Sequence, residues 1–197
     1  YKRNNDSPFL KKHNLKNDDL LLVLLPGSRQ QEINNHWPVF LETIFLLKEK
    51  LPSLRFCLVK SNNVIIKNIP DFIIIESSVT NALKHGTAAI SSSGTVNLEC
   101  ALAEIPTIVC YKTSYINWMI FKIFGKVNFI SIVNLISEEK IIPELIQSDM
   151  TSKKILPPLL EYLSPSSKKR KETIEKYKKI RTKLGSPGVF DRAAKHI

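Results

Sequence analysis

The sequence has few cysteines, histidines and glycines, and this scarcity excludes several kinds of site. Its 197 residues include three cysteines, four histidines and six glycines. An odd number of cysteines without short, regular spacing argues against a disulfide framework and against a zinc site. The four histidines are isolated and show no metal-ligand spacing. We therefore interpret Cys57, Cys100 and Cys110 as small core residues of a protein in a reducing compartment.

Several nucleotide-binding and catalytic motifs are also missing. The chain has no Walker loop, no Gly-x-Gly-x-x-Gly motif, no Gly-x-Ser-x-Gly elbow and no Asp-x-Asp pair. These absences disfavour an NTPase, an NAD-dependent enzyme, a hydrolase of that type and a diphosphate held through a metal ion. The longest uninterrupted apolar run, Leu20–Leu25, is far shorter than the roughly 20 residues that span a bilayer, and nothing resembles a signal peptide. We expect a cytoplasmic protein that is at most peripheral to a membrane, and a piece of a longer chain because its first residue is Tyr1.

Positive charge is abundant but unevenly placed. The net charge is +11, yet the body of the chain is much closer to balance than its end. This distribution disfavours a nucleic-acid partner and is typical of a solvated helix face, with an anionic membrane surface as the functional alternative. The basic residues concerned are Lys168, Lys169, Arg170, Lys171, Lys176, Lys178, Lys179, Arg181 and Lys183.

Short strand-like runs alternate with helical patterns through most of the chain, and the apolar fraction of 43% is that of a globular protein. Continuous apolar runs suit parallel strands, which are covered on both faces. The pattern predicts an α/β fold, a Rossmann-like parallel sheet with helices on both faces. The expected strands are Leu20–Leu25, Arg55–Lys60, Phe72–Glu76, Thr87–Ser91 and Thr107–Tyr111, and the expected helices are Ile33–Lys50, Asn62–Asn68, Thr80–His85 and Thr95–Ala103.

The second half of the chain has a different composition. Its aromatic segment, Tyr115–Lys126, is predicted to be a helix that lies either in the core or against lipid. The remaining expectations are a loop through Asn134, short helices near Pro143–Gln147 and Lys153–Leu163, a hinge at Ser164–Ser167 and a basic helix that ends at about Leu184.

Two glycine-containing turns each follow an expected strand and precede an expected helix. They are Pro26-Gly27-Ser28-Arg29 and Ser92-Ser93-Gly94-Thr95. Turns of this kind present unpaired backbone N–H groups, which suit a phosphate, and parallel strands place both at one edge of the sheet. Arg29 can bind a diphosphate through two hydrogen bonds, and the carboxylate of Glu99 can hold a ribose. The turns therefore predict a nucleoside diphosphate site, although a plain Pro-Gly turn, a helix cap and a dipole-favoured acid explain each piece separately.

In their order along the chain these motifs resemble the lipid-A-disaccharide synthases, inverting glycosyltransferases of the two-domain GT-B architecture. The resemblance covers nearly the whole chain, and it implies that the chain is the C-terminal donor-binding domain of such an enzyme. Besides the two turns, it rests on Glu32-Ile33, Val96–Glu99, Pro106, Val109–Lys112, Phe129–Ile136, Pro143–Gln147 and Leu184–Gly188.

The resemblance implies transfer of a diacylated glucosamine from UDP-2,3-diacylglucosamine to the 6-hydroxyl of 2,3-diacylglucosamine 1-phosphate, with release of UDP, in lipid A biosynthesis. Arg29 and Asn134 match positions that the family needs for activity, on the UDP-sugar side. The implied donor site also contains Gly27 and Ser28, with Ser93, Gly94 and Thr95 at the diphosphate, Glu99 at the ribose and Gln147 at the donor sugar. No cofactor and no metal ion are expected.

Two departures from the family pattern qualify these expectations. Val133 and Ser137 stand where the family usually has Pro and Gly, so we expect a less rigid loop around Asn134. Only the C-terminal half of the family is matched, and the missing N-terminal domain should supply the general base and most of the acceptor pocket. We expect residues 1–19 to be an interdomain linker or a remnant of that domain, residues 20–163 the Rossmann-like domain, and residues 164–197 a basic helical tail.

This division implies partners and leaves alternatives open. The chain alone should bind UDP without turning over substrate, at the cytoplasmic face of the inner membrane. Its last residues, 189–197, should be mobile or dock onto a second copy, which would make a homodimer. A non-catalytic UDP-sugar-binding remnant of a split or degraded gene, a UDP-sugar epimerase of similar fold and a basic nucleic-acid binder remain as alternatives.

Overall fold

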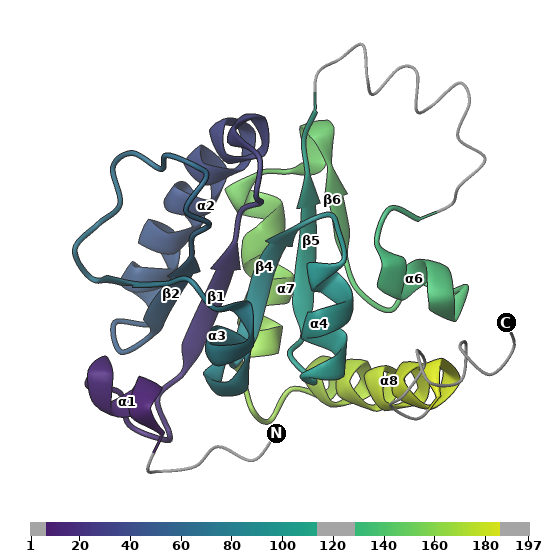
Figure 1. Cartoon of the computed structure of the whole chain (residues 1–197). Coiled ribbons are helices and arrows are strands. Elements are labelled where there is room, and N and C mark those ends of the chain that lie inside the picture. Colours follow the sequence, from purple (N-terminus) through teal and green to yellow (C-terminus); the bar gives the residue numbers. More distant parts are fainter. Residues whose placement is uncertain (1–6, 114–128, 186–197) are drawn as a thin grey trace, which may run out of the picture.

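A computed structural model of the chain describes residues 7–113 and 129–185 (Figure 1). The aromatic helix expected at residues 115–126 and the tail at residues 189–197 lie outside the described residues. The division at residues 19 and 163 stays a prediction.

A six-stranded parallel sheet forms the centre of the molecule, with the strand order β3-β2-β1-β4-β5-β6 (Figure 1). All five expected strands are confirmed, and the fold is the α/β class that the alternation predicted. The sixth strand, β6, lies where a short helix was expected, so that prediction is wrong. The strands are β1 (Leu21–Leu25), β2 (Arg55–Val59), β3 (Ile73–Glu76), β4 (Ala88–Ser92), β5 (Thr107–Tyr111) and β6 (Glu144–Ile146).

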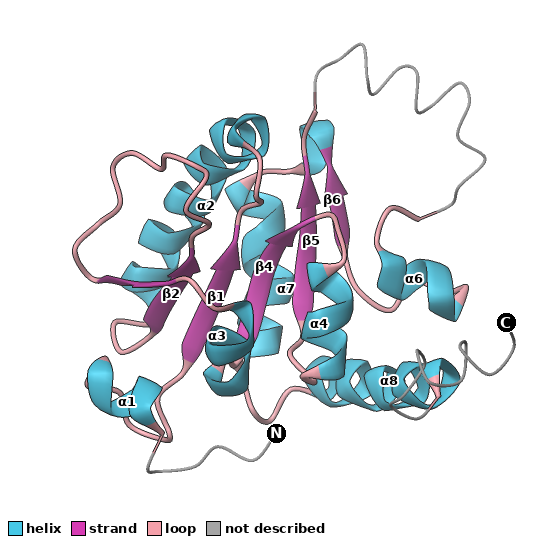
Figure 2. Cartoon of the chain, in the orientation of Figure 1, coloured by secondary structure: helices cyan, strands magenta, loops and turns pink. Residues whose placement is uncertain are grey.

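Helices cover both faces of this sheet (Figure 2). The long helix before β2, the helices that flank β4, the helix after β6 and the basic helix were all expected and are confirmed. The first helix was not expected, and Asn134 lies in a helix where a loop was expected. The helices are α1 (Pro8–Lys12), α2 (Gln30–Lys50), α3 (Val79–His85), α4 (Val96–Leu102), α6 (Ile132–Ser137), α7 (Ser152–Leu163) and α8 (Lys168–Leu184), with a 3₁₀ turn at Gln147–Asp149.

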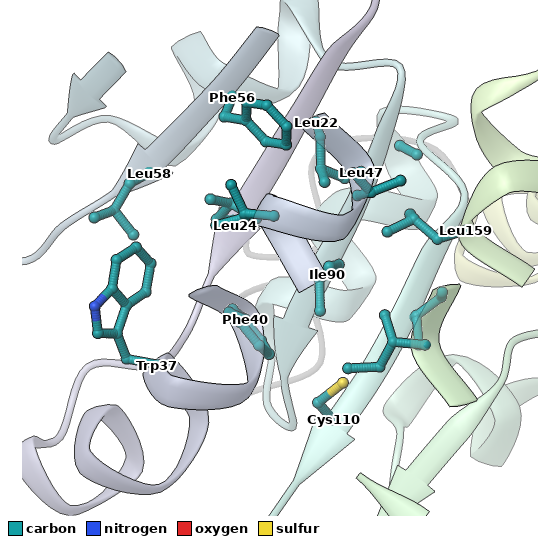
Figure 3. Close-up of a cluster of buried hydrophobic side chains, with 14 of the residues drawn as sticks. Leu22, Leu24, Trp37, Phe40, Leu47, Phe56, Leu58, Ile90, Cys110 and Leu159 are labelled. Atoms are coloured by element: carbon teal, nitrogen blue, oxygen red, sulfur yellow. The ribbon is translucent and has the colours of Figure 1, made fainter. Parts of the chain in front are cut away.

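The buried strand β1 shows why the chain forms three layers. Its five residues are all buried, and successive side chains point to opposite faces. Leu22 and Leu24 pack with α2 and α7, as Figure 3 shows for Phe40 of α2 and Leu159 of α7. The other three residues of β1 join a second cluster with side chains of α1, α3 and α4. A third cluster connects α4, α6 and α8 beside β5. An apolar strand without polar alternation therefore lies between two helical layers.

The segment Asn62–Asn68 is an extended loop, so the helix expected there is wrong. Val64 and Ile66 are buried while Ile65, between them, is 69% exposed, which is the alternation of an extended chain. The side-chain amide of Gln30 donates to the carbonyl of Ile65 and accepts from its N–H, both at 2.9 Å. Three successive β-branched residues disfavour a helix, and α2 satisfies the backbone of the loop instead.

Helix α1 belongs to the core even though it is short. Phe9 and Leu10 are 6% and 5% exposed and pack in the same cluster as one face of β1. Five residues are too few for a helical period to stand out in the sequence, which explains why α1 was missed. Among the helices that the structure describes, none is long and apolar enough to cross a membrane.

Candidate functional site

A cavity of about 710 Å³ opens at the carboxyl edge of the sheet, between the ends of β1 and β4. These two strands are neighbours, with Leu25 paired to Ser91, so the turns that follow them lie side by side. The strand order reverses between β1 and β4, and such a switch point is where α/β sheets bind ligands. Six residues named from the sequence line the cavity, namely Gly27, Ser28, Arg29, Ser93, Gly94 and Thr95.

The first turn does not present free amides as expected, because Glu32 already occupies them. The N–H groups of Ser28 and Arg29 donate to Oε2 of Glu32, at 3.1 and 3.4 Å. Gly27 has a φ of +123°, and a Cβ placed on it would lie 2.3 Å from the same carboxylate oxygen. The carboxylate therefore holds the turn from inside, in the position where the turn alone would attract an anion.

Arg29 remains available to a ligand. It is the N-cap residue of α2, its side chain is 84% exposed, and its Nη1 lies 4.0 Å from Oε1 of Glu32. An exposed ion pair at this distance contributes little to stability, so the guanidinium is free to bind an anion without disrupting the fold. Lys60, directly after β2, brings a second cation to the cavity.

The second turn is the more open of the two. Gly94 has a φ of +152°, and a Cβ on it would have no atom within 4 Å. The first bonds of α4 run from Asn97 and Leu98 to the carbonyls of Gly94 and Thr95. Among the described residues, no protein acceptor faces the N–H groups of Gly94, Thr95 and Val96. Of the two turns, this one offers backbone donors to a phosphate.

Glu99 is not brought into the cavity. It is exposed, in the first turn of α4, and lines a separate hollow of about 140 Å³ with Leu83 and Leu102. Its assignment to a ribose stays a prediction.

Asn134 is fully buried and its amide is saturated. Its Oδ1 accepts from the N–H groups of Ile141 and Ile142, at 2.8 and 3.0 Å, while its Nδ2 donates to the carbonyl of Ile142 and to Oε1 of Glu144. These four bonds use every donor and acceptor position of the side chain, so no polar atom is left for a ligand in this arrangement. Val133 and Ser137 both lie in helix α6 rather than in a loop, and the expected lower rigidity around Asn134 stays a prediction.

A series of hydrogen bonds nevertheless connects Asn134 to the cavity through its partner Glu144. The carboxylate of Glu144 accepts from the N–H groups of Ile130 and Ser131, at 3.0 and 2.9 Å. The carbonyl of Ile130 in turn accepts a hydrogen bond of 3.3 Å from the hydroxyl of Ser93, which lines the cavity. The arrangement holds the entry to α6 against the second turn.

Gln147 bonds to the backbone of Thr113. Its Oε1 accepts from the Thr113 N–H at 3.2 Å and its Nε2 donates to the Thr113 carbonyl at 3.3 Å. This pair connects the 3₁₀ turn after β6 to the end of β5. Gln147 does not line the cavity between β1 and β4, and its assignment to the donor sugar stays a prediction.

The cavity has further walls that sequence reasoning missed. They come from the loops after β2 and β3 and from the start of α3, and include Lys60, Ser61, Asn62, Asn63, Ser77 and Val79. These residues directly follow the carboxyl ends of expected strands, where α/β sheets bind ligands, and this position could have identified them from the sequence.

Glu76, at the end of β3, shapes one of these walls. Its Oε1 accepts from the N–H groups of Ser78 and Ser77, at 3.0 and 2.8 Å. The hydrogen bond from Ser78, followed by that from Ser77, holds the pKa of Glu76 below its usual value. The ionised carboxylate therefore orders the backbone at Ser77 and Ser78, and Ser77 lines the cavity. Within the described part of the chain, no three His, Cys, Asp or Glu side chains gather where they could hold a metal ion.

Comparison with known proteins finds one family model and several curated relatives that match nearly the whole chain. Residues 2–190 match the family model described as lipid-A-disaccharide synthetase. The chain is 30% identical over 192 residues to the lipid-A-disaccharide synthase of Coxiella burnetii (strain CbuG_Q212), a match that covers 95% of this chain and 51% of the relative. It is 34% identical over 193 residues to the synthase of Gloeothece citriformis (strain PCC 7424), covering 93% of this chain and 50% of the relative.

The fold has counterparts among solved structures. The calicheamicin glycosyltransferase CalG4 superposes with a TM-score of 0.59 at 14% identity, over 91% of this chain and 43% of that one. At such low identity the likeness concerns the fold, which is that of the glycosyltransferases with GT-B architecture. The chain spans about half the length of the curated relatives that it matches.

Proposed function

Because this chain belongs to the lipid-A-disaccharide synthase family, we propose that it is the donor-binding half of such an enzyme. The reaction is transfer of the sugar from UDP-2,3-diacylglucosamine to the 6-hydroxyl of 2,3-diacylglucosamine 1-phosphate, with inversion and release of UDP. The observation that carries the proposal is the cavity at the switch point of the sheet, lined by both turns and by the exposed Arg29.

The diphosphate of the donor has two kinds of partner in this cavity. The backbone N–H groups of Gly94, Thr95 and Val96 can donate to its oxygens, and the guanidinium of Arg29 can pair with its charge. These groups stabilise negative charge as it develops on the departing UDP, without a bound metal ion. The sugar would then lie towards the loops after β5 and β6. Glu99 lines a separate hollow, so it would hold the ribose only if the nucleoside extends beyond the cavity.

An inverting transfer also needs a base that takes the proton of the acceptor hydroxyl. We assign this base and the acceptor pocket to the part of the family's length that this chain does not span. Because both substrates carry acyl chains, the reaction would take place at a membrane surface, which we assign to the cytoplasmic face of the inner membrane. Helix α8, with its exposed lysines, lies near the amino ends of the strands, at the other end of the sheet from the cavity (Figure 1).

Calorimetric titration with UDP, with and without EDTA, tests the donor site. We expect binding that EDTA does not change and that weakens by roughly tenfold or more in Arg29→Ala, since a charge-assisted hydrogen bond is lost. Glu99→Ala tests the ribose contact in the same way. Arg181→Ala, on α8 and away from the cavity, is the matched charge control and should bind like the parent chain. A folded chain that does not bind UDP would contradict the proposal and favour a non-catalytic remnant.

Turnover separates the donor-binding half from a complete enzyme. The chain alone should not form the disaccharide from substrates in lipid vesicles, while addition of a family N-terminal half should restore product formation. Product formed by the chain alone would contradict our assignment of the base.

A further inference from the structure

His36 lies in the first turns of α2 and is fully buried. Its Nδ1 lies 2.8 Å from the carbonyl oxygen of Pro26, and its Nε2 lies 3.1 Å from the backbone nitrogen of Lys112. A carbonyl can only accept and an amide N–H can only donate, so Nδ1 carries the proton and Nε2 accepts. The two contacts together define one neutral tautomer of the ring.

These contacts join two loops that do not follow neighbouring strands. Pro26 opens the turn after β1, and Lys112 follows β5, while β4 lies between these strands. Asn35, the preceding residue of α2, adds a hydrogen bond of 3.1 Å from its Nδ2 to the carbonyl of Lys112. The start of α2 therefore spans the end of β4 and holds the loops on either side of the Ser92–Thr95 turn.

The surroundings of the ring favour its neutral form. Burial lowers the pKa of His36 below the usual value and outweighs the hydrogen bond to Pro26, which raises it. The charged groups that act on the ring are Glu32 on α2, which favours protonation, and Lys112 on the loop after β5, which opposes it. The rings of Phe40 and Tyr111 lie beside it, at centroid distances of 6.2 and 6.5 Å. A proton on Nε2 would face the N–H of Lys112 and break that bond.

We propose that His36 is a positioning residue of the donor site, which fixes the turn before Arg29 against the loop after β5, and that its protonation releases Lys112 and weakens donor binding. This inference rests on the proposed function, because it presupposes that a nucleotide sugar binds between the two turns. His36 touches no part of the expected donor and acts through Pro26 and Lys112.

The pH dependence of donor affinity tests the proposal. UDP-N-acetylglucosamine is the probe, because its diphosphate is esterified at both ends and keeps a constant charge from about pH 4 to about pH 8, a range that extends well below the usual pKa of histidine. We expect the affinity of the full chain to fall by about three- to tenfold towards the acid end, the effect of one lost hydrogen bond. Circular dichroism at each pH verifies that the chain remains folded.

Two substitutions separate positioning from simple packing. In His36→Gln the side-chain oxygen can take the place of Nε2 and accept from Lys112, so affinity at neutral pH should be largely kept and its pH dependence lost. His36→Leu should bind weakly at every pH. Glu42→Gln, exposed on the same helix, is the control and should follow the parent chain. Parallel pH profiles of the parent and His36→Gln, or parent-like affinity in a folded His36→Leu, would overturn the proposal.

The tautomer provides a readout that does not depend on the donor. Long-range ¹H–¹⁵N NMR of the free chain should show the proton on Nδ1, with the Lys112 amide resonance moving as the ring titrates. A proton on Nε2 at neutral pH would overturn the inference about His36. Absence of probe binding at every pH, with the expected tautomer present, would instead count against the proposed function and would confine His36 to a structural contact.

Discussion

Single residues at the cavity act mainly through the backbone around them. Glu32 accepts from two amides of the first turn, and Glu76 does the same for the loop after β3. An acid three residues after a helix start is a recognisable sequence feature, because its carboxylate can reach back to the N-cap amide. The sequence therefore contained the signal that Glu32 caps the start of α2. Because Glu32 caps it, the backbone amides of the first turn already bind a carboxylate and are not free for a phosphate.

The two cavity glycines should respond differently to an added methyl group. In Gly27→Ala the new Cβ would lie 2.3 Å from Oε2 and 2.8 Å from Cβ of Glu32, at a φ of +123° that disfavours alanine. We expect a loss of about 1–3 kcal/mol in the free energy of unfolding. Gly94→Ala meets no atom within 4 Å, so at its φ of +152° it should cost about 1–3 kcal/mol of backbone strain without an added contact, a smaller loss than in Gly27→Ala, while its methyl group weakens UDP binding at the open turn.

Urea unfolding monitored by circular dichroism measures both losses, and calorimetry measures UDP affinity. Each glycine variant is the control for the other. A larger loss of stability in Gly94→Ala than in Gly27→Ala would contradict the tight contact between Gly27 and Glu32.

At the scale of elements, helix α8 shows how a highly charged segment docks onto a domain. Thr173, Tyr177 and Ile180 recur at helical spacing and are buried on one side of α8. Arg170 lies one turn earlier, and its Nη1 donates to the carbonyls of Thr87 and Tyr162, each at 2.6 Å. One guanidinium thereby connects α8 to the start of β4 and to the end of α7.

Arg170→Ala should therefore destabilise the chain, in contrast to substitution of its neighbours. Loss of a charged donor that serves two buried carbonyls is expected to lower the free energy of unfolding by about 1.5–3 kcal/mol. Lys171→Ala, at an exposed position of the same helix, should change it by less than about 0.5 kcal/mol. Urea titrations compare the two, and equal effects would mean that the contacts of Arg170 add nothing to the docking of α8.

At the scale of the whole molecule, the three cysteines report on global opening. All are free and buried, in or against the central sheet. Burial raises the pKa of the Cys57 and Cys100 thiols to about 12, and it raises the pKa of Cys110 as well. At pH 8 about one thiol in ten thousand would be ionised even if a reagent could reach it.

We expect a disulfide reagent such as DTNB to leave the native chain unmodified at pH 8 and to label all three cysteines in concentrated urea. Because the thiolate is the reactive form and the side chains are inaccessible, labelling of the native chain should proceed only as fast as the molecule opens. A thiol that reacts rapidly without denaturant would contradict the packing of the core described above.

The alternation of apolar runs and helical periods was enough to predict the parallel α/β sheet, five of its strands and the two turns at one edge. These features follow from local properties, because an apolar run such as Leu21–Leu25 must be covered on both faces and a glycine turn must follow it. The likeness in motif order also identified the family, which residues 2–190 bear out.

Tertiary structure alone decided how the site is assembled. Strand β6 exists because β5 offers a free edge, and residues 62–68 are extended because the side chains of Gln30 and Trp37 bond their backbone. Asn134 is saturated by backbone groups up to eight residues away and by Glu144, and His36 joins two loops across a strand. Each of these contacts depends on which segments the strand order brings together, and the local periodicity of the sequence does not predict such pairings.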